Sequence, residues 1–159
     1  MSAFYRLILF TGLSAFTYGC SPIDVFEKTA TIPKQDWYYN DQPSFSFDIS
    51  DTASAYNIFI TLRHSDAYKF NNIWLKIGSI APGDSIHYQN LELQLASDAR
   101  GWEGNGMDDI FEVRKNITPG PVHFRSAGKY TFTVAQIMRQ NPLKNIFNVG
   151  IRVEKIRQQ

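Results

Sequence analysis

This chain lacks several features that would point to a particular class of protein. It has a single cysteine, Cys20, so no disulfide can form within it. A domain of ordinary size buries enough apolar surface to fold without such a bridge. Lysine and arginine number 16 and aspartate and glutamate 15, which leaves no basic excess of the kind that nucleic-acid binding needs. The sequence therefore excludes a disulfide scaffold and predicts no nucleic-acid partner.

Catalytic motifs are missing as well. The histidines are His64, His87 and His123, and none of them lies in an H-E-x-x-H motif. No G-x-S-x-G turn is present. The run His64-Ser65-Asp66 contains the residue types of a catalytic triad, but neighbours in a strand point to opposite faces and cannot align. We therefore predict a protein that is not an enzyme, with no catalytic residues, no metal, no cofactor and no small-molecule substrate.

Acidic residues offer the one chemical alternative. Asp108, Asp109 and Glu112 lie close together in the sequence and have the oxygen ligands that calcium prefers, but their spacing is not that of an EF-hand. A glycoside hydrolase would need two carboxylates about 5–10 Å apart in a cleft. Asp108 and Asp109 are adjacent in the sequence, which makes them a poor pair for that task. We interpret them as part of a solvated loop.

The N-terminus ends an apolar run at the only cysteine. Residues 1–6 carry a single positive charge, and residues 7–16 are mostly apolar. This is the pattern of an exported signal peptide, because the run is too short for a stable membrane anchor. Gly19 precedes Cys20, as at the cleavage point of a bacterial lipobox. We predict a signal peptide over residues 1–19 and a Cys20 that carries diacylglycerol and an additional acyl chain such as palmitate.

The lipobox pattern has one departure. Thr17 stands where a lipobox usually has Leu, Val or Ile. The alternatives are a secreted protein with a free cysteine, or a weak membrane anchor. With the lipobox, residues 20–24 form the lipidated N-terminus and its tether, and residues 25–159 form the folded domain.

Beyond the tether, apolar and polar residues alternate, which indicates strands with one buried face. We expect an edge strand over Val25–Ile32 that ends at Pro33. No window has helical spacing apart from a turn or two at Ile110–Val113. The pattern predicts an all-β protein with one domain, an antiparallel β-sandwich of jelly-roll type. Its further strands are expected around Phe45–Ile49, Tyr56–Leu62, Ile73–Ile77, Leu91–Leu95, Tyr130–Val134 and Val149–Val153.

One long stretch, Asp98–Gly128, departs from this alternation and is rich in glycine and proline. A stretch of this length without clear strands is either functional or disordered, and its aromatic residues argue against disorder. We predict a structured excursion that carries a partner-binding surface, because loops on a rigid scaffold often do so. The alternative for Trp102 is that its indole closes one end of the core. The candidate partner-binding residues are Trp102, Gly101, Gly104, Asp108 and Asp109.

Aromatic residues raise a second functional hypothesis, a carbohydrate-binding module of the cell envelope. Tyr68, Phe70, Trp74 and Trp102 would suit a platform on which sugar rings stack. A β-sandwich also buries many aromatic side chains, so the same residues fit a core. Exposed and coplanar rings of Trp74 and Trp102 would distinguish the two.

Several short motifs occupy the chain in a fixed order. They are Arg63-His64 with Tyr68, Asn71-Asn72-Ile73-Trp74-Leu75, Gly101-Trp102 with Gly104 and Gly106, Gly128-Lys129-Tyr130, Gln136-Ile137-Met138-Arg139, Pro142-Leu143, and Val149-Gly150-Ile151. In order and spacing they resemble the gliding-motility lipoprotein GldH family. The resemblance runs from Cys20 nearly to the C-terminus.

The resemblance implies a lipid-anchored component of the cell envelope that is needed for gliding and linked to type IX secretion. Its partners would be the membrane, through lipid on Cys20, and other envelope proteins of gliding and secretion. It implies no enzymatic activity. Surface-exported lipoproteins of gliding bacteria often have an acidic cluster after the cysteine, whereas here Asp24 and Glu27 are scattered. We therefore expect a domain that faces the periplasm.

Overall fold

Alternating burial along the strands shows how the sequence builds a layered protein. The computed structural model describes residues 24–156. In β3 (Ser44–Ile49) the side chains of Phe45, Phe47 and Ile49 are buried, and those between them are exposed. The same period of two recurs in β4 (Tyr56–Ser65), β5 (Asn72–Ile80), β11 (Gly128–Gln136) and β13 (Ile146–Lys155), so each strand presents one apolar face.

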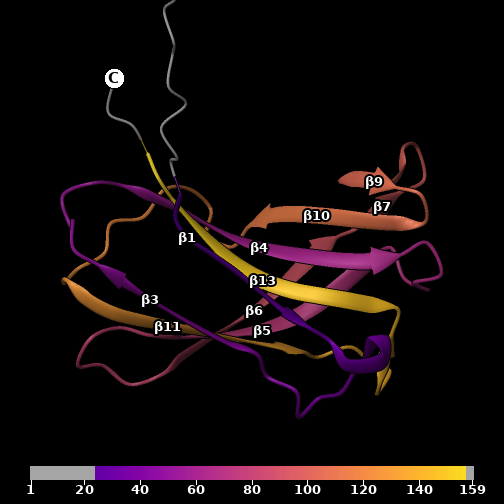
Figure 1. Cartoon of the computed structure of the whole chain (residues 1–159), viewed down its shortest axis with the longest axis horizontal. Coiled ribbons are helices and arrows are strands. Elements are labelled where there is room, and N and C mark those ends of the chain that lie inside the picture. Colours follow the sequence, from indigo (N-terminus) through magenta and orange to yellow (C-terminus); the bar gives the residue numbers. More distant parts are fainter. Residues whose placement is uncertain (1–23, 157–159) are drawn as a thin grey trace, which may run out of the picture.

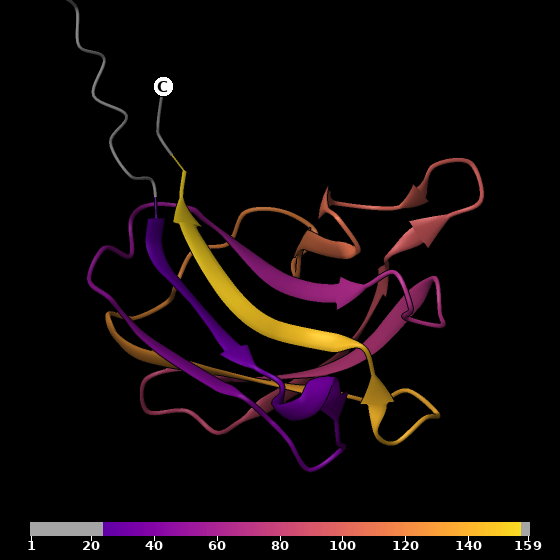
Figure 2. The same ribbon diagram turned by 45° about the vertical axis from the view of Figure 1, so that its right-hand side comes forward.

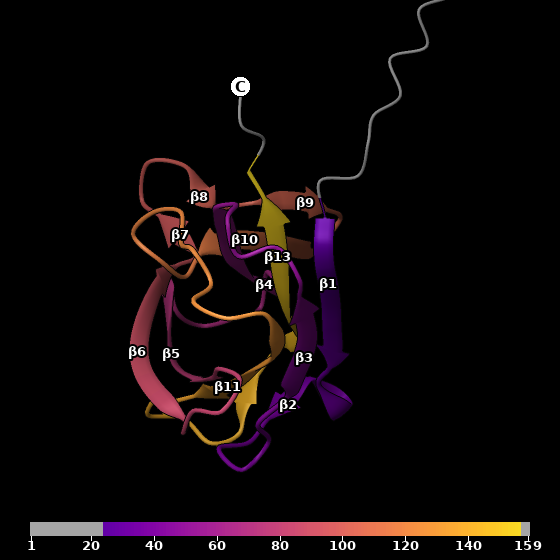
Figure 3. The ribbon, with the colours of Figure 1, turned by 90° about the vertical axis from the view of Figure 1, so that its left-hand side faces the viewer.

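These strands form two antiparallel sheets that pack face to face (Figures 1 and 3). One sheet has the order β1-β13-β4-β10-β9 and the other β3-β11-β5-β6. Two small ladders, β12-β2 and β7-β8, lie beside them. The remaining elements are β1 (Asp24–Thr31), η1 (Pro33–Gln35), β2 (Asp36–Trp37), β6 (His87–Gln94), β7 (Ala96–Ser97), β8 (Gly101–Trp102), β9 (Asn105–Met107), β10 (Ile110–Asn116) and β12 (Leu143–Lys144).

The strand order is that of a jelly roll. Counted along the chain, the eight long strands are β1, β3, β4, β5, β6, β10, β11 and β13. The first sheet pairs the first, eighth, third and sixth of these, and the second sheet pairs the second, seventh, fourth and fifth. This pairing of first with eighth, second with seventh, third with sixth and fourth with fifth is that of two Greek keys wound into a jelly roll. The prediction of an all-β sandwich of jelly-roll type is confirmed.

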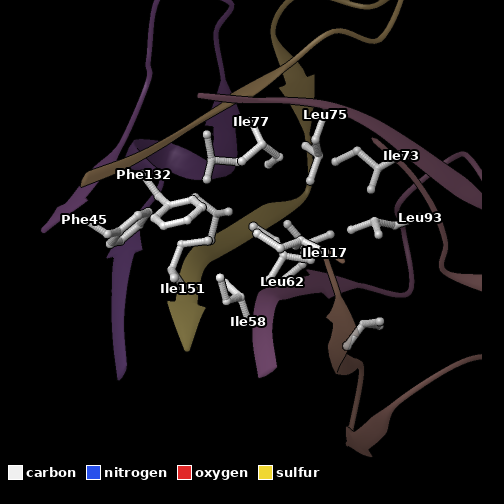
Figure 4. Packing of buried hydrophobic residues seen from close by; sticks show 14 of the residues in the cluster. Phe45, Ile58, Leu62, Ile73, Leu75, Ile77, Leu93, Ile117, Phe132 and Ile151 are labelled. Atoms are coloured by element: carbon white, nitrogen blue, oxygen red, sulfur yellow. The ribbon is translucent and has the colours of Figure 1, made fainter. Parts of the chain in front are cut away.

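The core lies between the two sheets. Figure 4 shows Phe45, Phe132 and Ile77 of one sheet facing Ile151, Ile58 and Leu62 of the other. The expected edge strand after the tether is also present, because β1 pairs only with β13 and Pro33 begins η1 directly after it.

The region around β10 corrects two sequence-based expectations. The helical turn predicted at Ile110–Val113 is wrong, because these residues open β10, which pairs with β4 from Ile110 to Asn116. The stretch Asp98–Gly128 is likewise not free of strands, since it contains β8, β9 and β10. Only Val113 of β10 is buried, so its alternation is weak, and pairing with the distant β4 decides its conformation.

The antiparallel strands give the sandwich two ends, which we name for reference. The near end is where β1 begins and β13 finishes, and it includes the loops 50–55, 81–86 and 117–127. The far end carries the loops 66–71, 95–109 and 137–145. Figures 1 and 2 show the start of β1 and the end of β13 together at the near end and the β9–β10 hairpin at the far end.

The predicted signal peptide and the predicted lipidation site, Cys20, lie outside the described residues. Across residues 24–156, no helix has the length and hydropathy needed to cross a bilayer.

Close packing of β13 against its neighbouring strands predicts that Gly150 tolerates no larger side chain. A Cβ atom added there would lie 2.6 Å from the Lys28 carbonyl oxygen, from Thr29 Cγ2 and from Thr61 Oγ1. We expect Gly150→Ala to lower the free energy of unfolding by roughly 1–3 kcal/mol, as overpacking does. Chemical denaturation measures the change. Gly120→Ala is the control, because no atom lies within 4 Å of its added Cβ. Equal stabilities for the two variants would contradict this account of β13.

Candidate functional site

An aromatic cluster closes the far end of the sandwich. The Trp102 ring lies 4.7 Å from His64 and 5.9 Å from Phe111 between ring centres, and the His64 ring lies 5.5 Å from Tyr68. Phe70 packs edge-on against Tyr68 at 5.7 Å. We call these five residues the Trp102 cluster. Because Trp102 is half-buried within it, the indole both covers the core and presents one edge to solvent.

Two predicted glycines make this arrangement sterically accessible. Gly101 and Trp102 form β8, which pairs with Ala96 and Ser97 of β7. Gly101 has φ +68° and Gly104 has φ +96°, backbone conformations that L side chains rarely adopt. At Gly104 a Cβ would lie 2.1 Å from the carbonyl oxygen of Glu112, so only glycine fits. These positions bend the chain from β8 back onto β10.

The acidic pair forms the tip of the far end. Asp108 and Asp109 make the two-residue turn between β9 and β10, whose ladder starts at Met107 and Ile110. Asp108 has φ +53°, a conformation that Asp tolerates better than most residues. Both side chains are exposed, and the Asp109 carbonyl accepts the Asp66 N–H at 2.8 Å. Within residues 24–156, no group of three or more His, Cys, Asp or Glu side chains is placed to hold a metal ion.

His64 is the buried titratable group of the cluster. Its side chain has 0% exposure, and Nδ1–H donates to the Ser65 carbonyl at 2.8 Å. Its Nε2 atom has no hydrogen-bond partner among the described residues. Burial lowers the pKa of His64 below its ordinary value, and the bond to Ser65 opposes this only partly. His64 is therefore neutral in the folded protein at physiological pH, and it is enclosed rather than open to a substrate.

A polar groove crosses the outer face of the five-stranded sheet beside the cluster. One depression of about 230 Å³ is lined by Arg63, Asn105, Gly106, Met107, Ile110 and Glu112. A smaller one, of about 40 Å³, is lined by Glu27, Thr29, Thr61, Arg63, Glu112 and Asn148. They share Arg63 and Glu112, whose Nε and Oε2 atoms are 3.6 Å apart. The half-exposed ion pair therefore lies where the two depressions adjoin, and we call them together the polar groove.

The groove and the cluster occupy opposite faces of the same short ladder. Arg63 pairs with Glu112, and the next residues, His64 and Phe111, pair with each other. Since successive side chains of a strand point to opposite faces, the first pair lines the groove and the second lies in the cluster. In the groove, Thr61 Oγ1 is buried and has no hydrogen-bond partner among the described residues.

The structure thus brings all five predicted partner-binding residues to the far end. Trp102 and Gly101 lie at the cluster, Gly104 lies against β10, and the acidic pair forms the tip. Sequence reasoning did not identify the groove residues Arg63, Glu112 and Met107, although Arg63 belongs to one of the motifs quoted above. Met107 is 79% exposed, and because the folded sheets decide this exposure, no signal in the sequence identified it.

The proposed sugar-stacking platform is not formed. Tyr68 is only 3% exposed, and its hydroxyl donates to the Asn72 carbonyl at 3.0 Å. Trp74 is 40% exposed, but it lies on the outer face of the four-stranded sheet. Trp102 packs instead against His64 and Phe111 between the sheets. The two tryptophans therefore do not share a face, which argues against the alternative hypothesis of a sugar-stacking platform.

These features define a jelly-roll domain with an aromatic cluster and a polar groove beside the β9–β10 hairpin. Comparison with known proteins identifies its family. The model of the GldH lipoprotein family matches residues 24–153, and the chain belongs to that family. The resemblance inferred from the sequence motifs is confirmed. Membership of a lipoprotein family associates the protein with a membrane of the cell envelope.

Two curated relatives are similar over most of their length. The chain is 27% identical over 161 residues to "Gliding motility lipoprotein GldH homolog" of Christiangramia forsetii, with 97% of both chains covered. It is 28% identical over 145 residues to "Gliding motility lipoprotein GldH" of Flavobacterium johnsoniae, which covers 87% of this chain and 89% of the relative. A solved structure, the infectious bursal disease virus VP2 subviral particle, aligns with 84% of this chain and 33% of its own at 15% identity and a TM-score of 0.31. We draw no conclusion from a TM-score this low.

Burial of His64 predicts a specific dependence of stability on pH. Because its folded pKa is depressed, its contribution to stability is complete above its ordinary pKa of about 6.5 and is lost as the pH falls below that value. We expect the melting temperature of the wild type to fall more between pH 7.5 and pH 5 than that of His64→Phe. His123→Gln, which changes an exposed histidine, should retain the wild-type dependence. Superimposable pH profiles for the wild type and His64→Phe would show that His64 does not titrate in this way.

Proposed function

We propose that this protein is a lipid-anchored, non-enzymatic component of the cell envelope that is required for gliding motility and for the associated type IX secretion. The observation that carries the proposal is the family match over residues 24–153, together with curated relatives named as gliding motility lipoproteins. The apolar run that ends at Cys20 supports lipid anchoring.

The described chemistry supports a binding role rather than catalysis. His64 is enclosed by aromatic rings and hydrogen-bonded to a backbone carbonyl, so it cannot reach a substrate in solution. Arg63 and Glu112 form an ion pair that crosses an exposed groove, which suits the recognition of polar groups. We assign partner recognition to the far end, and the partners to other envelope proteins of gliding and secretion.

Lipid anchoring predicts the behaviour of a Cys20 variant. Cys20→Ala should release the protein from membranes or leave its precursor uncleaved, because no acyl chain can be attached. Several acyl chains give far firmer anchoring than one, so in a fractionation experiment any cleaved Cys20→Ala protein should be almost absent from the membrane fraction. Labelling with a radioactive fatty acid checks the wild type. Membrane retention of Cys20→Ala, with no label in the wild type, would refute the anchor.

The same cells test the side of the membrane. We expect a periplasm-facing domain, so protease added to intact cells should spare the protein and protease added to lysed cells should digest it. Rapid loss from intact cells would place the domain on the cell surface instead.

Partner recognition at the far end predicts different outcomes for two variants. Trp102→Ala removes a ring packed against His64, Tyr68 and Phe111, so we expect the free energy of unfolding to fall by about 2–4 kcal/mol. A variant with Met107→Ala, Asp108→Asn and Asp109→Asn changes only exposed side chains and should alter it by about 0.5 kcal/mol or less. Denaturation of both purified variants measures these values.

The second variant then tests function without loss of the protein. We expect it to accumulate normally while gliding, secretion and co-purification of envelope proteins decline. Asp48→Asn, at an exposed position of β3 on the other sheet, is the matched control. Unimpaired gliding and co-purification in the triple variant would rule out recognition through the β9–β10 turn.

A further inference from the structure

The position of β1 relative to Cys20 limits how far the domain can stand from the membrane. This inference rests on the proposed anchor at Cys20. Four residue spacings separate Cys20 from Asp24, the first residue of β1. A chain of that length spans at most about 14 Å even when fully extended. By contrast, the ten residues of β13 extend for about 33 Å along the sandwich. The anchor therefore holds one particular end of the domain near the lipid.

We propose that the near end is a membrane-docking surface that rests on the lipid headgroups, and that the far end projects away from the bilayer. The near end comprises the start of β1 and the loops 50–55, 81–86 and 117–127. Figure 1 shows these segments gathered at the end of the sandwich where β1 begins and β13 finishes. The occupant of this surface is the membrane that holds the acyl chains of Cys20.

The side chains of the near end suit an interfacial position. Val25 and Ile86 are exposed large apolar residues, and Ile86 has 37% exposure. Arg125 and Lys129 are exposed cations on either side of the start of β11. Apolar and basic side chains together favour the boundary between headgroups and acyl chains.

The two acidic side chains of the near-end loops, Asp51 and Asp84, are engaged, so they oppose this contact little. Asp51 accepts hydrogen bonds from Lys155 Nζ at 2.5 Å and from Ser54 Oγ at 2.8 Å. Asp84 lies 3.1 Å from His87 Nε2 and accepts the Ser85 N–H at 2.7 Å. At the far end, neither Asp108 nor Asp109 takes part in an ion pair among the described residues, and their exposed carboxylates are repelled by anionic lipid.

Two of the near-end loops, 50–55 and 117–127, are also tied to the start of β4, which holds them in one arrangement. The Tyr56 hydroxyl donates to the Asp51 carbonyl at 2.6 Å. Tyr56 and Val122 exchange two backbone hydrogen bonds of 2.8 Å, which joins loop 117–127 to β4. The Ile156 N–H donates to the Ala55 carbonyl at 2.9 Å, which joins the end of β13 to loop 50–55.

This orientation points the proposed partner-binding end of the domain away from the anchoring membrane. The Trp102 cluster, the larger depression of the polar groove and the β9–β10 turn lie at the opposite end of the sandwich from the docking surface. A partner that binds them is met in the aqueous space beyond the anchoring membrane, rather than within the bilayer.

Tryptophan fluorescence in vesicles tests this orientation directly. All three native tryptophans, Trp37, Trp74 and Trp102, belong to the far half of the sandwich, so they provide a background that brominated lipids should not quench. We compare Ile86→Trp at the near end with Met107→Trp at the far end. The full chain is purified from bacterial membranes and reconstituted into phosphatidylcholine vesicles with brominated acyl chains. We expect Ile86→Trp to lose most of its added emission and Met107→Trp to lose none.

Separate readouts distinguish failure of the anchor from failure of the orientation. Flotation of the vesicles reports whether the purified chain is lipid-anchored. If it does not float, the anchor of the proposed function is wrong, and a maleimide lipid attached to Cys20, the only thiol of the chain, supplies the tether for the quenching measurement. Equal quenching of the two variants, or stronger quenching of Met107→Trp, would overturn the orientation. Unchanged melting of both variants controls for their fold.

Discussion

The structure depends on the placement of β13 between β1 and β4. The last strand of the chain pairs with the first along its length and with β4 on its other side. Bringing together residues so distant in sequence costs loop-closure entropy. Burial of Val149, Ile151 and Val153, each with 0% exposure, offsets this cost with about 1.5–3 kcal/mol per side chain. Gly150 lets the three strands approach closely, and the start of β1 and the end of β13 are thereby held together at the near end.

The ladder between β4 and β10 has the corresponding role at the far end. A single register places Arg63 opposite Glu112 and His64 opposite Phe111. The polar pair then faces solvent and the aromatic pair faces the Trp102 ring. The groove and the cluster are therefore coupled, since a shift of one residue in β10 would exchange their faces. The arrangement of side chains at this end therefore follows from strand pairing rather than from the loops alone.

Some residues that look functional in the sequence prove to be structural, and the reverse also holds. Gln136 is a polar residue near the end of a strand, yet it is buried and donates from Nε2 to the Trp37 carbonyl at 3.2 Å and to the Gln140 carbonyl at 3.3 Å. It holds the turn that follows β11. Arg63 and Glu112 form the centre of the groove, but nothing in their separate sequence contexts indicates that they meet. The sequence did single out the glycines around Trp102, and the structure gives the reason, because the close approach to β10 leaves no room for a Cβ at Gly104.

The sequence by itself determined the elements whose signal is local. Alternating side chains predicted every long strand except β10, the motifs identified the family, and the apolar run before Cys20 predicted the anchor. Only the tertiary structure decided which strands are neighbours, because pairing between β4 and β10 or between β1 and β13 depends on residues far apart in the chain. For the same reason it alone showed that Tyr68 is buried, that Trp74 and Trp102 lie on different faces, and that the groove lies at the far end. Burial is a property of the assembled sheets, and no short stretch of sequence contains it.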